Sequence, residues 1–368
     1  MRKHFLFAII ISCVVLLVGL RAQDTSALPP EAQKEFDRGL AAAEQKQWDL
    51  AVRHFADAQK SARTSPQVLF NLGLAYGKAG HLLPGIVWLH AYLAAVPQAA
   101  NADAVRKEIT RLEVAQEAIT ASIIQQASDA ASHLEMMRLA RLEDVCEMQA
   151  ASGDLEGAIR NQPQGRGIYE TKGHLWEHYL ISKAMAGDAQ AVLDGLDKVR
   201  PDLAVQSGVR GRTSDEIREV ENTAKCIVLN HLFHYQAEDA KDWDGASATI
   251  DKISQIGLWP ETSIRTSRES LDSFRKFSSN RWDALFRWLN LAPGQSQPTV
   301  CDIDLDLETA LRQALVPPVG TTDVSSWRED GGIVRNLLDV VDRRTQCWNT
   351  IQAADRALAW QASHPLTK

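Results

Sequence analysis

Small residues recur at a fixed interval near the start of the chain. The interval from Gly39 to Gly73 is the same as that from Ala51 to Gly85. A period of about 34 residues is typical of a helix–turn–helix unit that buries its apolar face against the next copy. The small residues would let the two helices of one unit approach closely. The spacing therefore predicts an all-α fold of stacked helix hairpins.

The second of these units carries a more detailed pattern. Leu72 and Gly73 are followed by Tyr76, Gly80 marks a turn, and Pro97 ends the unit. This order resembles the tetratricopeptide repeat, whose first helix carries Leu-Gly-x-x-Tyr. The tryptophan of that pattern is missing from both units. The resemblance implies a solenoid of helix hairpins whose first helices line an inner groove, and proteins of this kind generally bind peptides or other proteins there.

The turn-and-helix half of the unit returns further along the chain. It occurs at Gly153-Asp154 and again, after the same interval, at Gly187-Asp188, and residues 241–246 repeat four of the six residues at 46–51. The last interval is longer than the others, which fits an inserted loop near 201–213 that is rich in Gly, Pro, Arg and Ser.

Four regions follow from these patterns. We predict a signal peptide at 1–22, tandem repeats with a capping helix at 31–117, further hairpins with the inserted loop at 118–260, and an irregular helical region at 261–368.

The N-terminal region has the order of a secretory signal. Arg2 and Lys3 precede an apolar run from Phe5 to Leu20, and Ala22 offers the small residue that a signal peptidase prefers. The run is shorter than the ~20 residues that usually span a bilayer. We predict cleavage after Ala22 and a periplasmic or secreted protein. The alternative is an uncleaved segment that anchors the protein to a membrane.

Charge and cysteine content limit the partners and the redox state. A formal charge of −7 argues against a nucleic-acid partner, which would leave a basic footprint. Export leaves Cys146, Cys226, Cys301 and Cys347, which allow three pairings. We favour a Cys301–Cys347 disulfide, because the other two lie in helical patterns where a buried free thiol is common.

The repeat frame predicts which side chains face the groove. In the first two units they include Phe36, Leu40, Phe70, Leu74 and Lys78. An exposed aromatic row would favour a protein or peptide partner. The alternative is that Phe36 and Phe70 pack against each other or against the inserted segments.

A five-residue motif raises a different function. His174-Leu175-Trp176-Glu177-His178 matches the His-x-x-Glu-His signature of inverted-motif zinc peptidases. The surrounding pattern is a repeat helix without strands or an obvious distal ligand, so we expect no catalytic centre and no cofactor. The frame places His174, Glu177 and His231 toward the groove and turns His178 and His234 toward packing, with a shared structural zinc as the alternative.

Three functions remain open from the sequence. The favoured one is an exported scaffold without catalysis. The alternatives are a zinc-dependent hydrolase that uses the His174-x-x-Glu177-His178 motif and a structural envelope component that self-associates.

Overall fold

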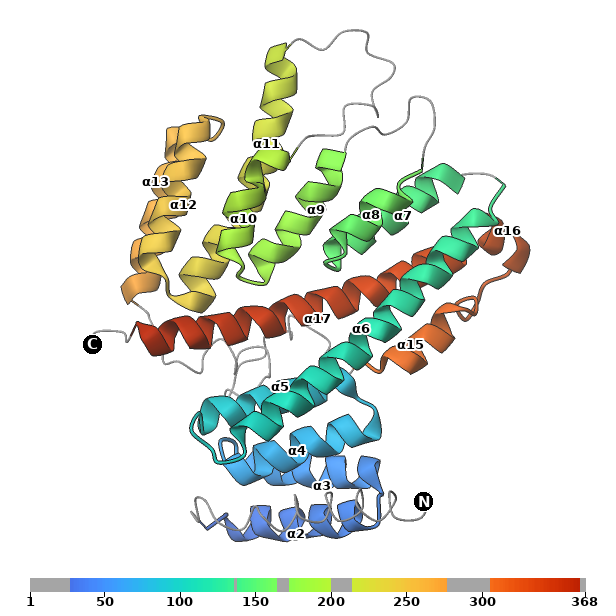
Figure 1. The fold of residues 1–368 in the computed structure, drawn as a ribbon, viewed down its shortest axis with the longest axis vertical. Helices are drawn as coiled ribbons and strands as arrows, with labels where there is room; N and C mark the ends of the chain where they lie inside the picture. The colour runs from blue at the N-terminus through green and yellow to red at the C-terminus, as the bar shows by residue number, and fades with distance from the viewer. Residues whose placement is uncertain (1–26, 136–137, 164–171, 200–213, 277–304, 365–368) are drawn as a thin grey trace, which may run out of the picture. The chain divides into compact units, whose positions relative to one another are not determined.

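The chain folds into helices and turns. The computed structural model describes residues 27–135, 138–163, 172–199, 214–276 and 305–364, and no strand occurs among them (Figure 1). The all-α prediction is confirmed for this part of the chain. The predicted signal peptide at 1–22 and the whole of the predicted loop near 201–213 lie outside the described residues.

The helices belong to two compact units. Unit 1 comprises Met1–Gly80 and Pro84–Leu112, and unit 2 comprises His81–Leu83 and Glu113–Lys368. None of the helices in the described ranges is both long and apolar enough to cross a membrane. The helices that lie in unit 1, wholly or in part, are α2 (Pro30–Glu44), α3 (Trp48–Ser61), α4 (Pro66–Ala79), α5 (Leu82–Ala95) and α6 (Ala102–Ser132).

Close helix contacts in unit 1 depend on glycine. A Cβ atom on Gly39 would lie 2.5 Å from the ring of Phe55, and one on Gly73 would lie 2.9 Å from Leu89. Phe55 and Leu89 are both fully buried. The predicted role of small residues in bringing the two helices of a hairpin together is confirmed at these two positions.

Five turns in the described residues share one backbone form. Each contains a residue with positive φ, and the next helix begins two residues later. A left-handed residue at this point reverses the chain and strongly favours glycine. The five residues are Lys46 (φ 60°), Gly80 (φ 93°), Gly153 (φ 106°), Gly187 (φ 77°) and Lys241 (φ 60°).

The turn at Lys46 leads to a stability prediction. An L-residue in the left-handed region costs about 1 kcal/mol or more, and glycine does not pay that cost. We expect Lys46→Gly to raise the free energy of unfolding by about 1 kcal/mol, measured by urea denaturation with circular dichroism. Lys46→Ala is the control, because it removes the same exposed side chain and keeps the strain. Equal stability of the two variants would contradict the explanation.

Unit 2 is a succession of hairpins followed by three further described helices. Consecutive helices from α7 to α13 contact one another, and the first helices α7, α9 and α11 also contact each other in sequence. The elements are α7 (Arg138–Ala151), α8 (Leu155–Asn161), α9 (Lys172–Met185), α10 (Ala189–Gly195), the 3₁₀ turn η2 (Leu196–Lys198), α11 (Ser214–His234), the π-helix η4 (Tyr235–Ala240), α12 (Trp243–Ile256), α13 (Glu261–Lys276), α15 (Leu307–Ala314), α16 (Val324–Glu329) and α17 (Gly332–Ser363).

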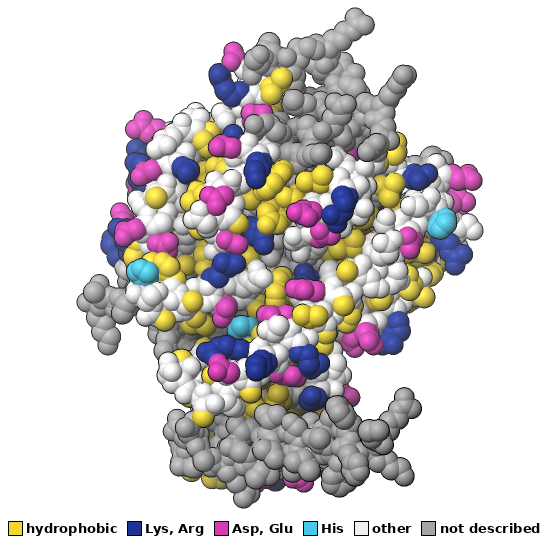
Figure 2. Space-filling view, in the orientation of Figure 1, with side chains coloured by type: hydrophobic (Ala, Val, Ile, Leu, Met, Phe, Trp, Pro, Cys, Tyr) yellow, Lys and Arg dark blue, Asp and Glu magenta, His cyan; other side chains and the backbone are white. Residues whose placement is uncertain are grey.

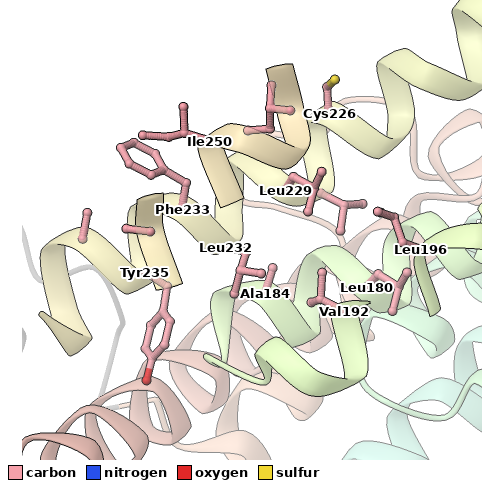
Figure 3. Packing of buried hydrophobic residues seen from close by; sticks show 14 of the residues in the cluster. Leu180, Ala184, Val192, Leu196, Cys226, Leu229, Leu232, Phe233, Tyr235 and Ile250 are labelled. Atoms are coloured by element: carbon pink, nitrogen blue, oxygen red, sulfur yellow. The ribbon is translucent and has the colours of Figure 1, made fainter. Parts of the chain in front are cut away.

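Apolar side chains from these hairpins form a shared core. Leu180 of α9, Leu229 and Leu232 of α11 and Ile250 of α12 are all buried and belong to one cluster (Figure 3). Tyr235 continues this cluster at the start of η4. The core therefore joins successive hairpins rather than filling each one separately.

The long helix α17 packs against elements of three successive hairpins. It contacts α7, α9 and η4, which continues α11 (Figure 1). Ser182 donates to Asn349 at 3.2 Å, and Gln361 donates to the carbonyl of Asp239 at 3.1 Å. The region predicted at 261–368 as irregular thus contains one continuous helix of 32 residues.

The cysteines divide as expected where the structure describes them. Cys146 and Cys226 are free and buried, which confirms that prediction. Burial raises the pKa of the Cys146 thiol to about 11, so it is not a thiolate at neutral pH. Cys347 is disulfide-bonded. Its predicted partner, Cys301, lies outside the described residues.

Charged side chains on the helix surfaces form local pairs. Arg38 pairs with Glu35 at 2.7 Å and Lys60 pairs with Asp57 at 2.6 Å, each one helical turn apart. On the face in Figure 2, basic and acidic side chains are interspersed. This arrangement is typical of solvated helix faces.

Candidate functional site

The two aromatics predicted to line the groove are buried. Phe36 is 8% exposed and packs on Phe55 with ring centroids 5.5 Å apart, and Phe70 is 2% exposed and packs on Tyr92 at 5.1 Å. The prediction of an exposed aromatic row is therefore wrong. Each ring gains an aromatic partner from the following helix, which removes it from water.

The other predicted groove residues of unit 1 remain accessible. Leu40 and Leu74 are partly exposed, and Lys78 is exposed. Leu40 and Leu74 lie on α2 and α4, the first helices of two consecutive hairpins.

The two histidines of the His-x-x-Glu-His motif lie beside a glutamate from another helix of unit 2. His174 and His178 lie one turn apart on α9, so their side chains share a helix face. Glu147 on α7 lies opposite them. His174 Nε2 is 3.0 Å from Glu147 Oε1 and 3.3 Å from His178 Nε2, and His178 Nε2 is 3.7 Å from Glu147 Oε2. We call these three residues the Glu147 cluster.

Glu177 contacts this cluster from another side. Its carboxylate lies 3.7 Å from Nδ1 of His174, the ring nitrogen that does not point to Glu147. A peptidase of the His-x-x-Glu-His type needs this glutamate beside a metal-bound water. Here the Glu177 carboxylate is placed to orient the His174 ring instead.

The structure revises which histidines belong together. His178 was expected to turn toward packing, but its side chain is 34% exposed, close to the 31% of His174. His234 was also expected to pack, yet it is 54% exposed and pairs with Glu238 at 2.8 Å. His231 lies outside the only group of three or more potential metal ligands found among the described residues. The position of a histidine along its helix does not by itself predict whether its side chain is exposed or which residues it contacts.

The cluster distributes protons unevenly. The hydrogen bond to Glu147, and then the nearby Glu177 carboxylate, raises the pKa of His174 to about 10. Burial lowers the pKa of His178, and the neighbouring His174 lowers it further. Burial alone would raise the pKa of Glu147, but its hydrogen bond with His174 and the charges of both histidines lower it. At neutral pH the arrangement thus favours an ionised Glu147, a charged His174 and a neutral His178.

Glu147 was missed by the sequence reasoning. The repeat frame makes α7 the first helix of the hairpin before α9, so an acidic residue on α7 was the signal to look for. Three acidic residues lie within one turn and a half there, namely Glu143, Asp144 and Glu147. Only the packing of α7 on α9 selects Glu147.

Comparison with known proteins adds no assignment. No protein-family model matches the sequence, and no curated protein matches it either.

Proposed function

We propose that the chain is an exported tetratricopeptide-type scaffold that binds a helical segment of a protein partner on the first helices of its hairpins. It forms a solenoid and performs no catalysis of its own. The repeated turns support the repeat assignment. In each of five hairpins, a residue with positive φ lies two positions before the start of the second helix.

The placement of α17 carries the functional proposal. A 32-residue helix lies against α7 and α9, the first helices of two successive hairpins in unit 2, and against η4, which continues the first helix of the next hairpin. Repeat hairpins of this chain therefore offer a surface on which an α-helix packs. Helix recognition by such a surface is a general mode of peptide binding.

Unit 1 has first helices of the same kind. On α2 and α4 the partly exposed Leu40 and Leu74 and the exposed Lys78 provide apolar contacts with a charge beside them. An amphipathic partner helix with an acidic edge would fit these side chains. We propose this face as the site for the external partner.

The position of Glu177 also supports a function without catalysis. Its carboxylate is directed at Nδ1 of His174 rather than placed with the three side chains of the Glu147 cluster. A hydrolase of the His-x-x-Glu-His type would lack its general base in this arrangement.

Affinity capture tests the scaffold proposal. The bait is residues 23–368, used to capture proteins from an envelope extract of the producing cell, and the variant is Leu40→Glu with Leu74→Glu. Two buried charges at the centre of an interface should lower recovery of the specific partner at least about tenfold. Crosslinking followed by mass spectrometry should place a helical segment of that partner on α2 and α4.

A matched control carries two charge changes elsewhere in unit 1. Arg53 on α3 and Lys107 on α6 are exposed, so Arg53→Glu with Lys107→Glu alters charge away from α2 and α4. Both variants must keep the circular dichroism of the parent chain. Equal recovery of all partners by the two variants would contradict the proposal that the partner binds on α2 and α4.

A further inference from the structure

We infer that Glu147, His174 and His178 bind one divalent transition-metal ion, and that zinc is the ion the site suits best. The ion would join α7 to α9. Binding of the ion to unit 2 is independent of partner binding on unit 1.

The distances between the donor atoms fit one ion. Zinc binds imidazole nitrogen and carboxylate oxygen at about 2.0–2.2 Å in a tetrahedral arrangement, which places neighbouring donor atoms about 3.4 Å apart. His174 Nε2 lies 3.0 Å from Glu147 Oε1 and 3.3 Å from His178 Nε2, whereas the 3.7 Å separation joins His178 Nε2 to the other carboxylate oxygen, Oε2. With one donor atom counted from each residue, the three atoms lie within 4.8 Å of one another. Small side-chain rotations would bring them to the spacing that one ion needs, and the fourth position would remain for water.

The types of donor select the class of ion. Two imidazoles and one carboxylate suit zinc and its neighbours in the first transition row, whereas magnesium and calcium prefer oxygen donors throughout. Glu147 lies on α7 and the two histidines lie one turn apart on α9, and these two helices pack against each other. Rigid elements of this kind hold donors more accurately than loops do.

Glu177 completes the site by supporting one of the ligands. Metal-binding histidines usually donate their other ring N–H to a carboxylate, which fixes the tautomer and makes the ligand more basic. The Glu177 carboxylate lies 3.7 Å from Nδ1 of His174, and its side chain is 18% exposed. It therefore lies on the side of the ring where such a partner belongs.

Ion pairing alone accounts for only part of this geometry. A hydrogen bond between His174 and Glu147 explains the shortest distance, yet His178 also points Nε2 at His174 Nε2, 3.3 Å away. Two ring nitrogens facing each other can share one proton at most. A metal ion between them would use the lone pairs of both.

Metal titration tests the inference. Untagged protein is stripped with a chelator and titrated with Zn²⁺ by calorimetry, and with Co²⁺ as a visible-absorption probe. We expect about one equivalent to bind, with the strong Co²⁺ bands of a four-coordinate nitrogen and oxygen site. Binding of less than about 0.1 equivalent of either ion would overturn the inference.

Substitutions then identify the ligands. Glu147→Gln, His174→Ala and His178→Ala should each abolish the four-coordinate Co²⁺ spectrum, and Glu177→Gln should weaken Zn²⁺ affinity by about 10- to 100-fold. His231→Ala and His234→Ala are matched controls on α11, and they should bind like the parent chain. A loss of binding in either control, or full binding after His178→Ala, would overturn the assignment. Melting curves with and without Zn²⁺ on the unsubstituted chain give a second readout that needs no variant, and they should show a rise in Tm on adding metal.

Discussion

Replacing Gln116 with methionine is expected to destabilise unit 2 by about 3 kcal/mol. Arg344 of α17 is 2% exposed, and its Nε donates to Gln116 Oε1 of α6 at 2.6 Å. Burial lowers the pKa of Arg344 to about 10, which shows how strongly the guanidinium has lost its hydration. Removing the acceptor that Nε contacts leaves a buried charged donor unsatisfied, and such losses cost several kcal/mol. Chemical denaturation followed by circular dichroism measures the change.

A double variant tests the cause of this loss. Arg344→Met in the Gln116→Met background removes the charge together with its acceptor, and apolar replacement of a buried polar pair is often neutral or better. We expect the double variant to regain at least about half of the lost stability. If its loss instead equals the sum of the two single losses, the two side chains are not coupled and the explanation fails.

Gly187→Ala is expected to cost about 2–5 kcal/mol. Gly187 has φ 77°, and a Cβ atom there would overlap the ring of Tyr235. An L-residue in the left-handed region costs about 1–2 kcal/mol, and overpacking a buried contact costs about 1–3 kcal/mol more. Tyr235 is 7% exposed and belongs to the core of unit 2, so it has little room to move (Figure 3). The melting temperature and the urea midpoint should both fall.

Gly153→Ala is the matched control for that substitution. Gly153 occupies the equivalent turn of the preceding hairpin, has φ 106°, and has no neighbouring atom within 4 Å of its missing Cβ. This variant should lose only the backbone cost of about 1–2 kcal/mol. Equal losses at Gly153 and Gly187 would show that Tyr235 contributes nothing.

The turns were the most predictable part of the fold. Gly80, Gly153 and Gly187 could be placed from sequence because glycine at a helix end has a local cause. The match between residues 241–246 and 46–51 also had structural meaning, since Lys46 and Lys241 both take φ 60°. Local backbone requirements of this kind are written in a few neighbouring residues.

The side-chain environment of α2 and α4 was less predictable. The repeat frame assigned Phe36 and Phe70 to the groove, but Phe36 lies at helical spacing with the buried Ala32 and Gly39 of α2, and Phe70 is buried on α4. The rings of Phe55 and Tyr92 decide it, because they offer apolar contact on the buried side. Such a choice depends on the neighbouring helix and not on the helix itself.

Contacts between distant segments were not predictable. Glu147 joins His174 and His178 only because α7 packs on α9, and Arg344 meets Gln116 across 228 residues of sequence. A repeat frame identifies neighbouring hairpins, but it gives no rotation of a helix about its axis. The position of α17 lies outside the repeat pattern altogether.

The position of α17 has a consequence for the order in which the chain acquires its structure. The ribosome makes α7, α9 and η4 long before it makes α17, the helix that packs against all three of them. Until Gly332–Ser363 has been made, the apolar side chains that α17 later contacts face water, so the hairpins of unit 2 are open to premature association. The sequence range of unit 1 ends at Leu112, so the ribosome completes it long before it makes the last helix of unit 2.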